Sequence, residues 1–408
     1  MANAREKTVI GEQNSYDVAV VGAGPSGSQC ARLLAERGHS VVLIEKHPRT
    51  RTHIICTGIV GAEGFSRFAL PRDSVLFELT KARLVSPGGN TLDYATSKPF
   101  ALVVDRSKFD GHLQTRAAQK GVQVCYGFQA EDVEERQDEI RIQGRNGNGR
   151  KQVRARVAVF ANGFSPRLAR RLGLALPDDA VQGVQAEARV RKLDRAEVYF
   201  GRRIAPGFFA WVVPIGGGRA RVGLLARKNS SKHFREFLRS APLREILLEE
   251  PAAVSCRPIG QGLLPKTAGA RFLVLGEAAG QVKTSTGGGI YYGLRCAELA
   301  AQVVDDVLRA GGISNGGLQR YHNLCVQLLK GELEAGLRLQ RLGGLLKDTD
   351  IDFLFHLIGS NGLLGQLRRR VNFDWHETLI DFLLRHPSLT GVLRTLTNQR
   401  FPAAQISS

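Results

Sequence analysis

Two glycine-rich stretches have the residue types and spacing that a nucleotide cofactor requires. The first, Gly22-Ala23-Gly24-Pro25-Ser26-Gly27, follows the apolar run Tyr16–Val21 and opens a segment of helical spacing. In such a G-x-G-x-x-G turn, the glycines permit a tight turn, a close approach of backbone N–H groups to pyrophosphate, and close packing of helix on strand. Glu45 ends the next apolar run and is placed to bind a ribose hydroxyl, and the adjacent Lys46 is also expected to contact the cofactor. We therefore expect a dinucleotide site.

The second stretch, Arg271–Gly289, reads RFLVLGEAAGQVKTSTGGG and precedes Ile290. An apolar strand runs into Gly276-Glu277, where the carboxylate can meet a ribityl chain. Gly287, Gly288 and Gly289 let backbone amides approach the edge of a flavin ring. The first motif suits either NAD or FAD, but an enzyme that binds only NAD has no need of this later loop. The two motifs together predict non-covalently bound FAD.

Four short apolar runs are expected to form the parallel sheet that positions these motifs: Tyr16–Val21, Val41–Glu45, Val153–Ala161 and Phe272–Leu275. The segments between them, Ala82–Val104 and Val181–Leu225, alternate as antiparallel strands do, and the first contains a Pro87–Asn90 turn. From Leu318 onward the apolar spacing is helical. This helical region can pack on its own domain, cap an apolar tunnel or rest on a bilayer.

The expected fold class is α/β: a discontinuous Rossmann-type FAD-binding domain, an antiparallel β-rich substrate domain and a C-terminal helical region. The FAD-binding domain is assigned to residues 14–62, 104–178 and 256–317. The substrate domain is assigned to residues 63–103 and 179–255, and the helical region to residues 318–408.

Composition and charge limit the partners. The chain has 408 residues, 43% of them hydrophobic, and a net charge of +19 that lies mostly between Arg141 and Pro242. The resulting basic face either aids solubility or meets lipid headgroups or a phosphorylated substrate. No nucleic acid is expected, because no recognised nucleic-acid-binding module accompanies the charge.

Cysteine spacing and the N-terminus indicate the compartment. Six cysteines lie scattered without C-x-x-C pairs, so neither a disulfide framework nor a metal site is expected. Met1–Ser15 is polar, and no apolar run is long enough to span a bilayer. We expect a cytoplasmic protein, with peripheral contact at the anionic inner face of the membrane as a further option.

The segment GEAAGQVKTSTGGGIYYGL resembles the second FAD motif of the geranylgeranyl reductase family, within the p-hydroxybenzoate hydroxylase-like flavoproteins. The resemblance extends to Cys56-Thr57-Gly58, to Arg106 in DRSKFDGHL, to Ala161-Asn162-Gly163 and to Phe209-x-Trp211-x-Val213-Pro214. Beyond the first glycine motif, it implies that FAD is contacted by Ala23, Glu45, Cys56, Thr57, Gly58, Arg106, Ala130, Gly163, Gly276, Glu277, Gly288, Gly289 and Ile290. Glu277 and Asn162 stand where the family usually has Asp.

The same resemblance implies that Phe209, Trp211 and Pro214 line a lipid tunnel, although a Trp on an alternating strand is also typical of a core. Cys56 is the candidate catalytic residue, as a proton donor or positioning group near the flavin. Its alternative role is that of a small buried hydrophobic residue.

The implied activity is reduction of C=C bonds in an isoprenoid chain by hydride transfer from reduced flavin. The substrate would be an isoprenoid lipid or a prenyl diphosphate, and the electron donor NADPH or a ferredoxin-like protein. Two alternatives remain: a flavin monooxygenase (hydroxylase, epoxidase or halogenase) acting on a hydrophobic substrate, because one fold hosts several chemistries, and a flavoprotein with no redox role.

Overall fold

The computed structural model describes residues 15–48, 55–147, 149–175, 179–311, 313, 316–360, 363–387 and 389. The polar segment Met1–Asn14 and residues 390–408 of the expected helical region lie outside the described residues.

A seven-stranded sheet carries the first glycine motif, in the order β8-β2-β1-β11-β10-β9 with β17 beside β11. Strands β8, β2, β1, β11 and β17 are parallel to one another, whereas β10 is antiparallel to both β11 and β9. The strands are β1 (Ser15–Val21), β2 (Val41–Glu45), β8 (Gln123–Tyr126), β9 (Phe128–Glu135), β10 (Ile140–Asn146), β11 (Gly149–Phe160) and β17 (Phe272–Val274). The four apolar runs expected to be parallel strands are therefore confirmed as one layer.

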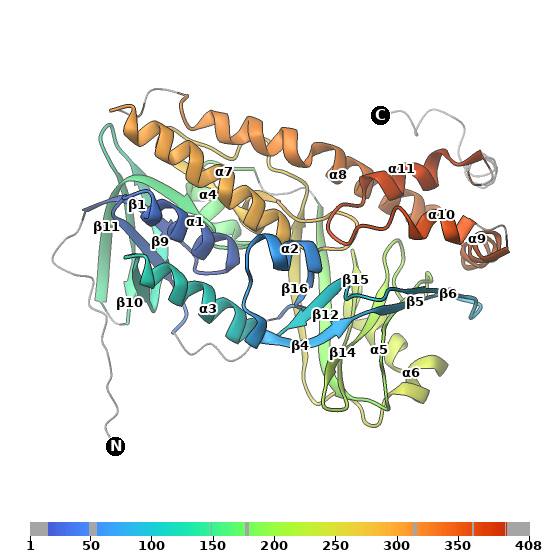
Figure 1. Ribbon diagram of the computed structural model, residues 1–408. Helices are drawn as coiled ribbons and strands as arrows, with labels where there is room; N and C mark the ends of the chain where they lie inside the picture. Colours follow the sequence, from blue (N-terminus) through green and yellow to red (C-terminus); the bar gives the residue numbers. More distant parts are fainter. Residues whose placement is uncertain are drawn as a thin grey trace, which may run out of the picture.

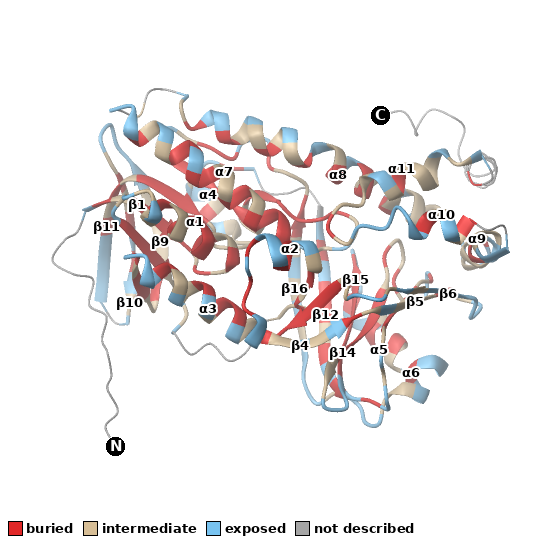
Figure 2. Ribbon diagram, in the orientation of Figure 1, coloured by how far each residue is buried: buried red, intermediate tan, exposed pale blue. Residues whose placement is uncertain are grey.

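Helices cover both faces of this sheet, which explains why its central strands are almost wholly apolar. One face carries α1 (Pro25–Glu36), α3 (Arg106–Gln119) and α7 (Ile290–Arg309), with α8 (Gln319–Leu345) lying along α7 (Figure 1). The other face packs against the short α4 (Pro166–Arg171). Figure 2 shows buried residues on the inner sides of α1 and α7 and exposed residues on the outer side of α8.

A second seven-stranded sheet follows the order β16-β12-β15-β14-β13-β5-β6, and every pair except β13–β5 is antiparallel. Its strands are β5 (Lys81–Val85), β6 (Thr91–Ala95), β12 (Asp179–Arg189), β13 (Ala196–Tyr199), β14 (Ala210–Gly216), β15 (Arg219–Ala226) and β16 (Val254–Gln261). It is flanked by α5 (Ser230–Leu238) and α6 (Ala241–Ile246). Residues 256–261 thus lie in this sheet and not, as the sequence division placed them, in the Rossmann-type layer, because β16 pairs along its length with β12.

Smaller elements join these layers to the C-terminal helices. A three-stranded sheet contains β3 (Ile59–Gly61), β4 (Val75–Leu79) and β7 (Ala101–Val104). Helix α2 (Ala62–Arg67) follows β3, and the 3-10 turn Arg72–Ser74 precedes β4. A second 3-10 turn, Gly276–Ala279, follows β17. The last helices are α9 (Asp348–Ser360), α10 (Leu363–Arg368) and α11 (Glu377–Arg385), beyond the end of α8 (Figure 1). No helix in the described part of the chain is long and apolar enough to cross a membrane.

Candidate functional site

The first glycine motif forms a tight turn between β1 and α1. Gly22 has a φ of +103°, and a methyl group there would lie 2.4 Å from the Ala161 carbonyl oxygen. A methyl group at Gly27 would lie 1.9 Å from the Gly22 carbonyl oxygen. Both positions therefore require glycine, for backbone conformation at the first and for close packing at both.

Above the start of α1 the same turn leaves room for a ligand. A methyl group at Gly24 would meet no atom within 4 Å. The Ala23 N–H donates to Glu45 Oε2 at 2.9 Å, which holds this carboxylate beside the turn, while Lys46 is exposed. Free amides and the positive end of the helix dipole favour a phosphate group here. The turn and its donors therefore fit the pyrophosphate and ribose of a dinucleotide.

Ser26 brings the two glycine motifs together. A methyl group at Gly276 would lie 2.9 Å from Ser26 Oγ, and one at Gly293 in α7 would lie 2.1 Å from it. The turn after β17 therefore packs directly on the first turn of α1. Two motifs about two-thirds of the chain apart share one site because their glycines lack side chains at this contact.

The loop of the second motif closes on itself before α7 begins. The Lys283 N–H donates to the Gly288 carbonyl at 2.9 Å, and the Gly287 N–H donates to the Lys283 carbonyl at 2.8 Å. Gly289 is the N-cap of α7 and Ile290 its first residue. The amides at this helix start have no intrahelical acceptor, so they can donate to a bound group.

The Cys56-Thr57-Gly58 segment is held against the second sheet. The Thr57 hydroxyl donates to Gln185 Oε1 at 2.9 Å, and Gln185 Nε2 donates to the Cys56 carbonyl at 3.3 Å. The buried Arg221 donates to the carbonyls of Thr57 (2.8 Å) and Val104 (3.0 Å). Side chains of β12 and β15 thus fix the segment that carries Cys56.

Two arginines lie close to Cys56, and each is paired with a carboxylate. Arg106 donates to both carboxylate oxygens of Asp110 at 2.9 Å, and Arg257 pairs with Glu277. Burial opposes both charges, but Asp110 and Cys56 raise the pKa of Arg106, and Glu277 and Cys56 raise that of Arg257, above their ordinary values. Both side chains therefore stay cationic beside the thiol.

An apolar cavity of about 240 Å³ adjoins the second motif. Its walls come from the segment after β13, from the second-motif loop and from the C-terminal helices. They include Phe200, Phe208, Phe209, Ser285, Leu339, Leu342, Leu346, Ile351, Leu354, Phe355, Ile358, Leu383, Leu384 and Leu389. Such a cavity can enclose a flexible hydrocarbon chain away from water.

Of the three expected tunnel residues, only Phe209 lines this cavity. Trp211 lies one strand repeat further along β14, with its ring 6.0 Å from that of Phe209 and its indole covering Gly223. Pro214 is buried at the irregular register between β14 and β15. Trp211 packs against Phe209, and neither Trp211 nor Pro214 lines the cavity.

Two further expected cofactor contacts are Ala130 and Gly163. The residue before Gly163 adjoins the first glycine turn, because a methyl group at Gly22 would lie 2.8 Å from Asn162 Cα. Ala130 is in β9, packed at the edge of the hydrophobic core on the α4 side of the sheet. Gly163 lines a separate cavity of about 20 Å³ with Asn162 and Ala278. The described contacts do not bring these two residues to the Cys56 segment.

Sequence reasoning missed Gln185, Arg221 and Arg257, which hold Cys56 and Glu277 from the second sheet. Each stands on a strand of this sheet, and the sequence alone does not tell which polar side chains of those strands face the Cys56 segment. Their contacts with Cys56, Thr57 and Glu277 distinguish them.

Comparison with known proteins identifies the family. The chain matches the FAD binding domain family over residues 15–328. It is 29% identical, over 93% of its length and 99% of the relative, to digeranylgeranylglycerophospholipid reductase 2 of Methanothermobacter thermautotrophicus. The resemblance to the geranylgeranyl reductase family is thereby confirmed.

Solved structures share the fold. A geranylgeranyl bacteriochlorophyll reductase-like protein from Thermoplasma acidophilum matches with a TM-score of 0.83 and 23% identity, over 94% of this chain and 99% of that one. A p-nitrophenol 4-monooxygenase from Pseudomonas putida matches with a TM-score of 0.69 and 17% identity, over 90% and 99% of the two chains. From the family match and the geometry of its glycine motifs, the chain belongs to the FAD binding domain family, and FAD is its cofactor.

Proposed function

We propose that this protein is an FAD-dependent reductase that saturates C=C bonds of a geranylgeranyl-type isoprenoid chain. The observation that carries the proposal is the apolar cavity, which shares Ser285 with the second-motif loop. A hydrocarbon chain in this cavity would lie next to the loop expected to hold the flavin. The curated relatives that match along the chain are named as reductases of such lipids, whereas the likeness to a monooxygenase is one of fold alone.

The residues around the two motifs would hold FAD in sections. Gly22, Gly24, Ser26, Gly27 and the start of α1 would bind the pyrophosphate, and Glu45 the ribose. Glu277 would face the ribityl chain, and Gly288, Gly289 and Ile290 the edge of the ring. When bound and reduced, the flavin supplies the hydride.

The remaining task of the protein is to orient the alkene, exclude water and provide a proton. The cavity walls serve the first two purposes. Cys56 is the proposed proton donor, because its thiol interacts with both Arg106 and Arg257, and Arg257 also pairs with Glu277 of the second motif. Phe209 would contact the chain directly, with Trp211 behind it.

The polar end of the substrate is proposed to be anionic, as in a phospholipid or a prenyl diphosphate. Arg202 lines the cavity and is exposed at its rim, and Arg227 lies over the ring of Phe208 at 5.7 Å. The same positive charge would support peripheral contact with an anionic membrane. The electron donor is proposed to be NADPH or a ferredoxin-like protein.

Anaerobic turnover tests the activity. The purified protein, reduced with dithionite under nitrogen, should add two hydrogens per double bond to a geranylgeranylated glycerophospholipid, as measured by mass spectrometry. A strict requirement for oxygen would instead identify a monooxygenase, and a product of unchanged mass would identify a non-redox role.

A matched pair of glycine variants tests the cofactor site. Gly24→Ala should leave the fold intact, because a methyl group there meets no protein atom, but should leave the purified protein colourless. Gly111→Ala, in α3, also meets no atom within 4 Å and should retain FAD. Equal FAD content in both variants would contradict the assignment of the first motif.

A further inference from the structure

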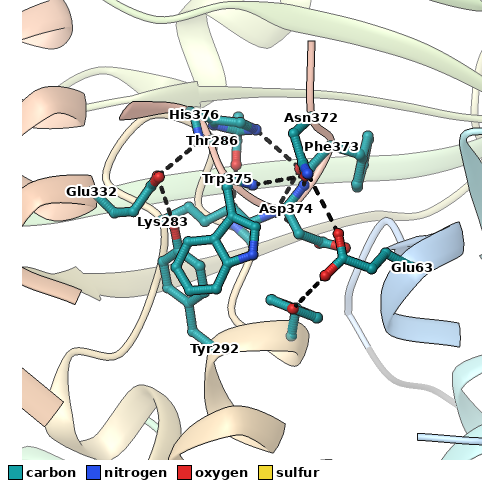
Figure 3. Close-up of polar contacts among 12 residues, drawn as sticks. Glu63, Lys283, Thr286, Tyr292, Glu332, Asn372, Phe373, Asp374, Trp375 and His376 are labelled. Atoms are coloured by element: carbon teal, nitrogen blue, oxygen red, sulfur yellow. Dashed lines mark hydrogen bonds and ion pairs between the residues drawn. The ribbon is translucent and has the colours of Figure 1, made fainter. Parts of the chain in front are cut away.

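A segment of the C-terminal region contacts the second-motif loop at Lys283 and Ser285. This segment, Asn372–His376, connects α10 with α11 and is called the strap here (Figure 3). Lys283 of the second motif extends toward it. Its ammonium group donates to the Phe373 carbonyl at 2.7 Å and to Asp374 Oδ1 at 3.0 Å.

The Lys283–Asp374 ion pair is almost completely removed from water. The side chains are 5% and 2% exposed, and the ammonium group also lies over the rings of Tyr292 and Phe373. Burial lowers the pKa of Lys283 and raises that of Asp374, and their mutual attraction opposes both shifts. Apolar side chains of similar volume are often as stabilising as a buried ion pair. A contribution to stability alone therefore does not account for this pair.

The backbone of Lys283 shapes the loop that its side chain anchors. Its N–H and carbonyl bond to Gly288 and Gly287 respectively, so the residue closes the turn that leads to Gly289 and Ile290. The backbone amides proposed to meet the flavin ring lie in or directly after this turn. The position of the Lys283 backbone consequently determines the positions of the backbone amides of Gly288, Gly289 and Ile290.

The strap itself is fixed by residues from other helices. Glu332 of α8 accepts from the N–H groups of His376 (2.8 Å) and Glu377 (3.0 Å) at the start of α11. The Tyr292 hydroxyl donates to the same carboxylate at 3.1 Å. These three hydrogen bonds fix the position of the strap relative to α7 and α8.

A second contact joins the strap to the loop. His376 Nε2 lies 3.0 Å from the Phe373 carbonyl, so this nitrogen carries the proton, and Nδ1 accepts from the Ser285 hydroxyl at 2.7 Å. Ser285 also lines the apolar cavity. The strap therefore contacts the loop at two of its residues.

We propose that Lys283 and Asp374 are positioning residues that hold the Lys283–Gly289 loop in the shape that receives FAD. FAD binding then depends on the C-terminal helices, although the strap itself is not expected to touch the cofactor. The inference rests on the proposed function in one respect, the binding of FAD by this loop.

The test replaces the ion pair by apolar groups in the full-length protein. Lys283→Met/Asp374→Leu should unfold near the wild-type temperature, yet its FAD dissociation constant should rise about tenfold, with a shifted flavin absorption spectrum. The control, Arg338→Met/Asp381→Leu, removes an exposed 2.9 Å pair between α8 and α11 and should change neither. An unchanged dissociation constant and spectrum in the folded double variant would overturn the inference.

A second variant covers the case in which the double variant does not fold. Asp374→Asn keeps the shape and one acceptor for Lys283, and should weaken FAD binding severalfold; wild-type affinity and spectrum would again overturn the inference. Wild-type protein that binds FAD, alongside variants that bind it equally well, rejects only the positioning role. Wild-type protein that binds no FAD rejects the proposed function as well.

Discussion

The Arg257 guanidinium of β16 donates to both carboxylate oxygens of Glu277, which lies in the 3-10 turn after β17. This ion pair joins the antiparallel sheet to the Rossmann-type sheet beside Cys56. It also gives a physical reason why Glu, and not the shorter Asp expected from the family resemblance, is accommodated at this position. The longer side chain has a cationic partner on the opposite sheet.

A double-mutant cycle should show that this pair couples the two sheets. Arg257→Met and Glu277→Gln should each destabilise the protein, and the double variant should be more stable than additivity predicts by about 1 kcal/mol. Urea unfolding provides the measurement. The same cycle on the exposed pair Lys81–Asp194 should give a smaller coupling. Additive effects at Arg257 and Glu277 would show that the sheets are held by other contacts.

Replacing Cys56 separates its two candidate roles. If the thiol delivers the proton, Cys56→Ala should lower turnover about 100-fold while FAD content stays at the wild-type level. Cys256→Ala, which removes an exposed cysteine of β16, should have no such effect. Wild-type turnover in Cys56→Ala would leave Cys56 the role of a small packing residue.

Filling the apolar cavity should affect the substrate but not the cofactor. Leu354→Trp adds volume inside a cavity of about 240 Å³ and should reduce isoprenoid turnover more than about tenfold, since overpacked or occluded cavities exclude a ligand. Phe353→Trp changes the neighbouring exposed residue of α9 and should leave turnover unchanged. Steady-state rates and bound FAD should be measured together, because loss of FAD in Leu354→Trp would indicate damage to the fold instead.

Acid should destabilise the protein partly through His376. Burial, followed by the charge of Lys283, lowers the pKa of His376 to about 4, so the unfolded chain takes up this proton first as the pH falls. The stability that depends on His376 remaining uncharged is fully present above about pH 6.5 and is lost progressively as the pH falls toward 4. The free energy of unfolding then decreases by up to about 1.4 kcal/mol per pH unit.

Unfolding free energies measured from pH 7 to pH 4.5 test whether stability falls with pH as predicted. His376→Asn should have a smaller loss of stability over this range than the wild type, and His356→Asn, at an exposed position of α9, should match the wild type. Identical slopes for His376→Asn and wild type would mean that His376 titrates normally.

The two glycine motifs and the parallel strands that carry them could be predicted from the sequence, because their chemistry is local. Gly22 needs glycine for the positive φ of its own tight turn, and Gly27 because a methyl group there would meet the Gly22 carbonyl. Apolar runs such as Val41–Glu45 indicate strands buried on both faces. The Pro87–Asn90 turn was predictable for the same reason.

The supports of the site could not be predicted, because they depend on long-range register. Arg257 meets Glu277 only once β16 pairs with β12, and a strand of alternating burial does not reveal that pairing. Asp374 is an ordinary acidic residue in a polar connection until Lys283 reaches it. Phe209 and Trp211 are neighbours on one strand face, yet only the former borders the cavity, since the C-terminal helices define where that cavity ends.

The Lys283 ammonium group finds its carboxylate 91 residues further along the chain. During synthesis, the G-x-G-x-x-G turn and the second-motif loop leave the ribosome well before Asp374 does. If the strap shapes that loop as proposed, a nascent chain acquires its full affinity for the cofactor only after Asp374 has also been synthesised and has reached Lys283. Loading of the yellow holoprotein would then wait for the strap, and not for the two glycine motifs.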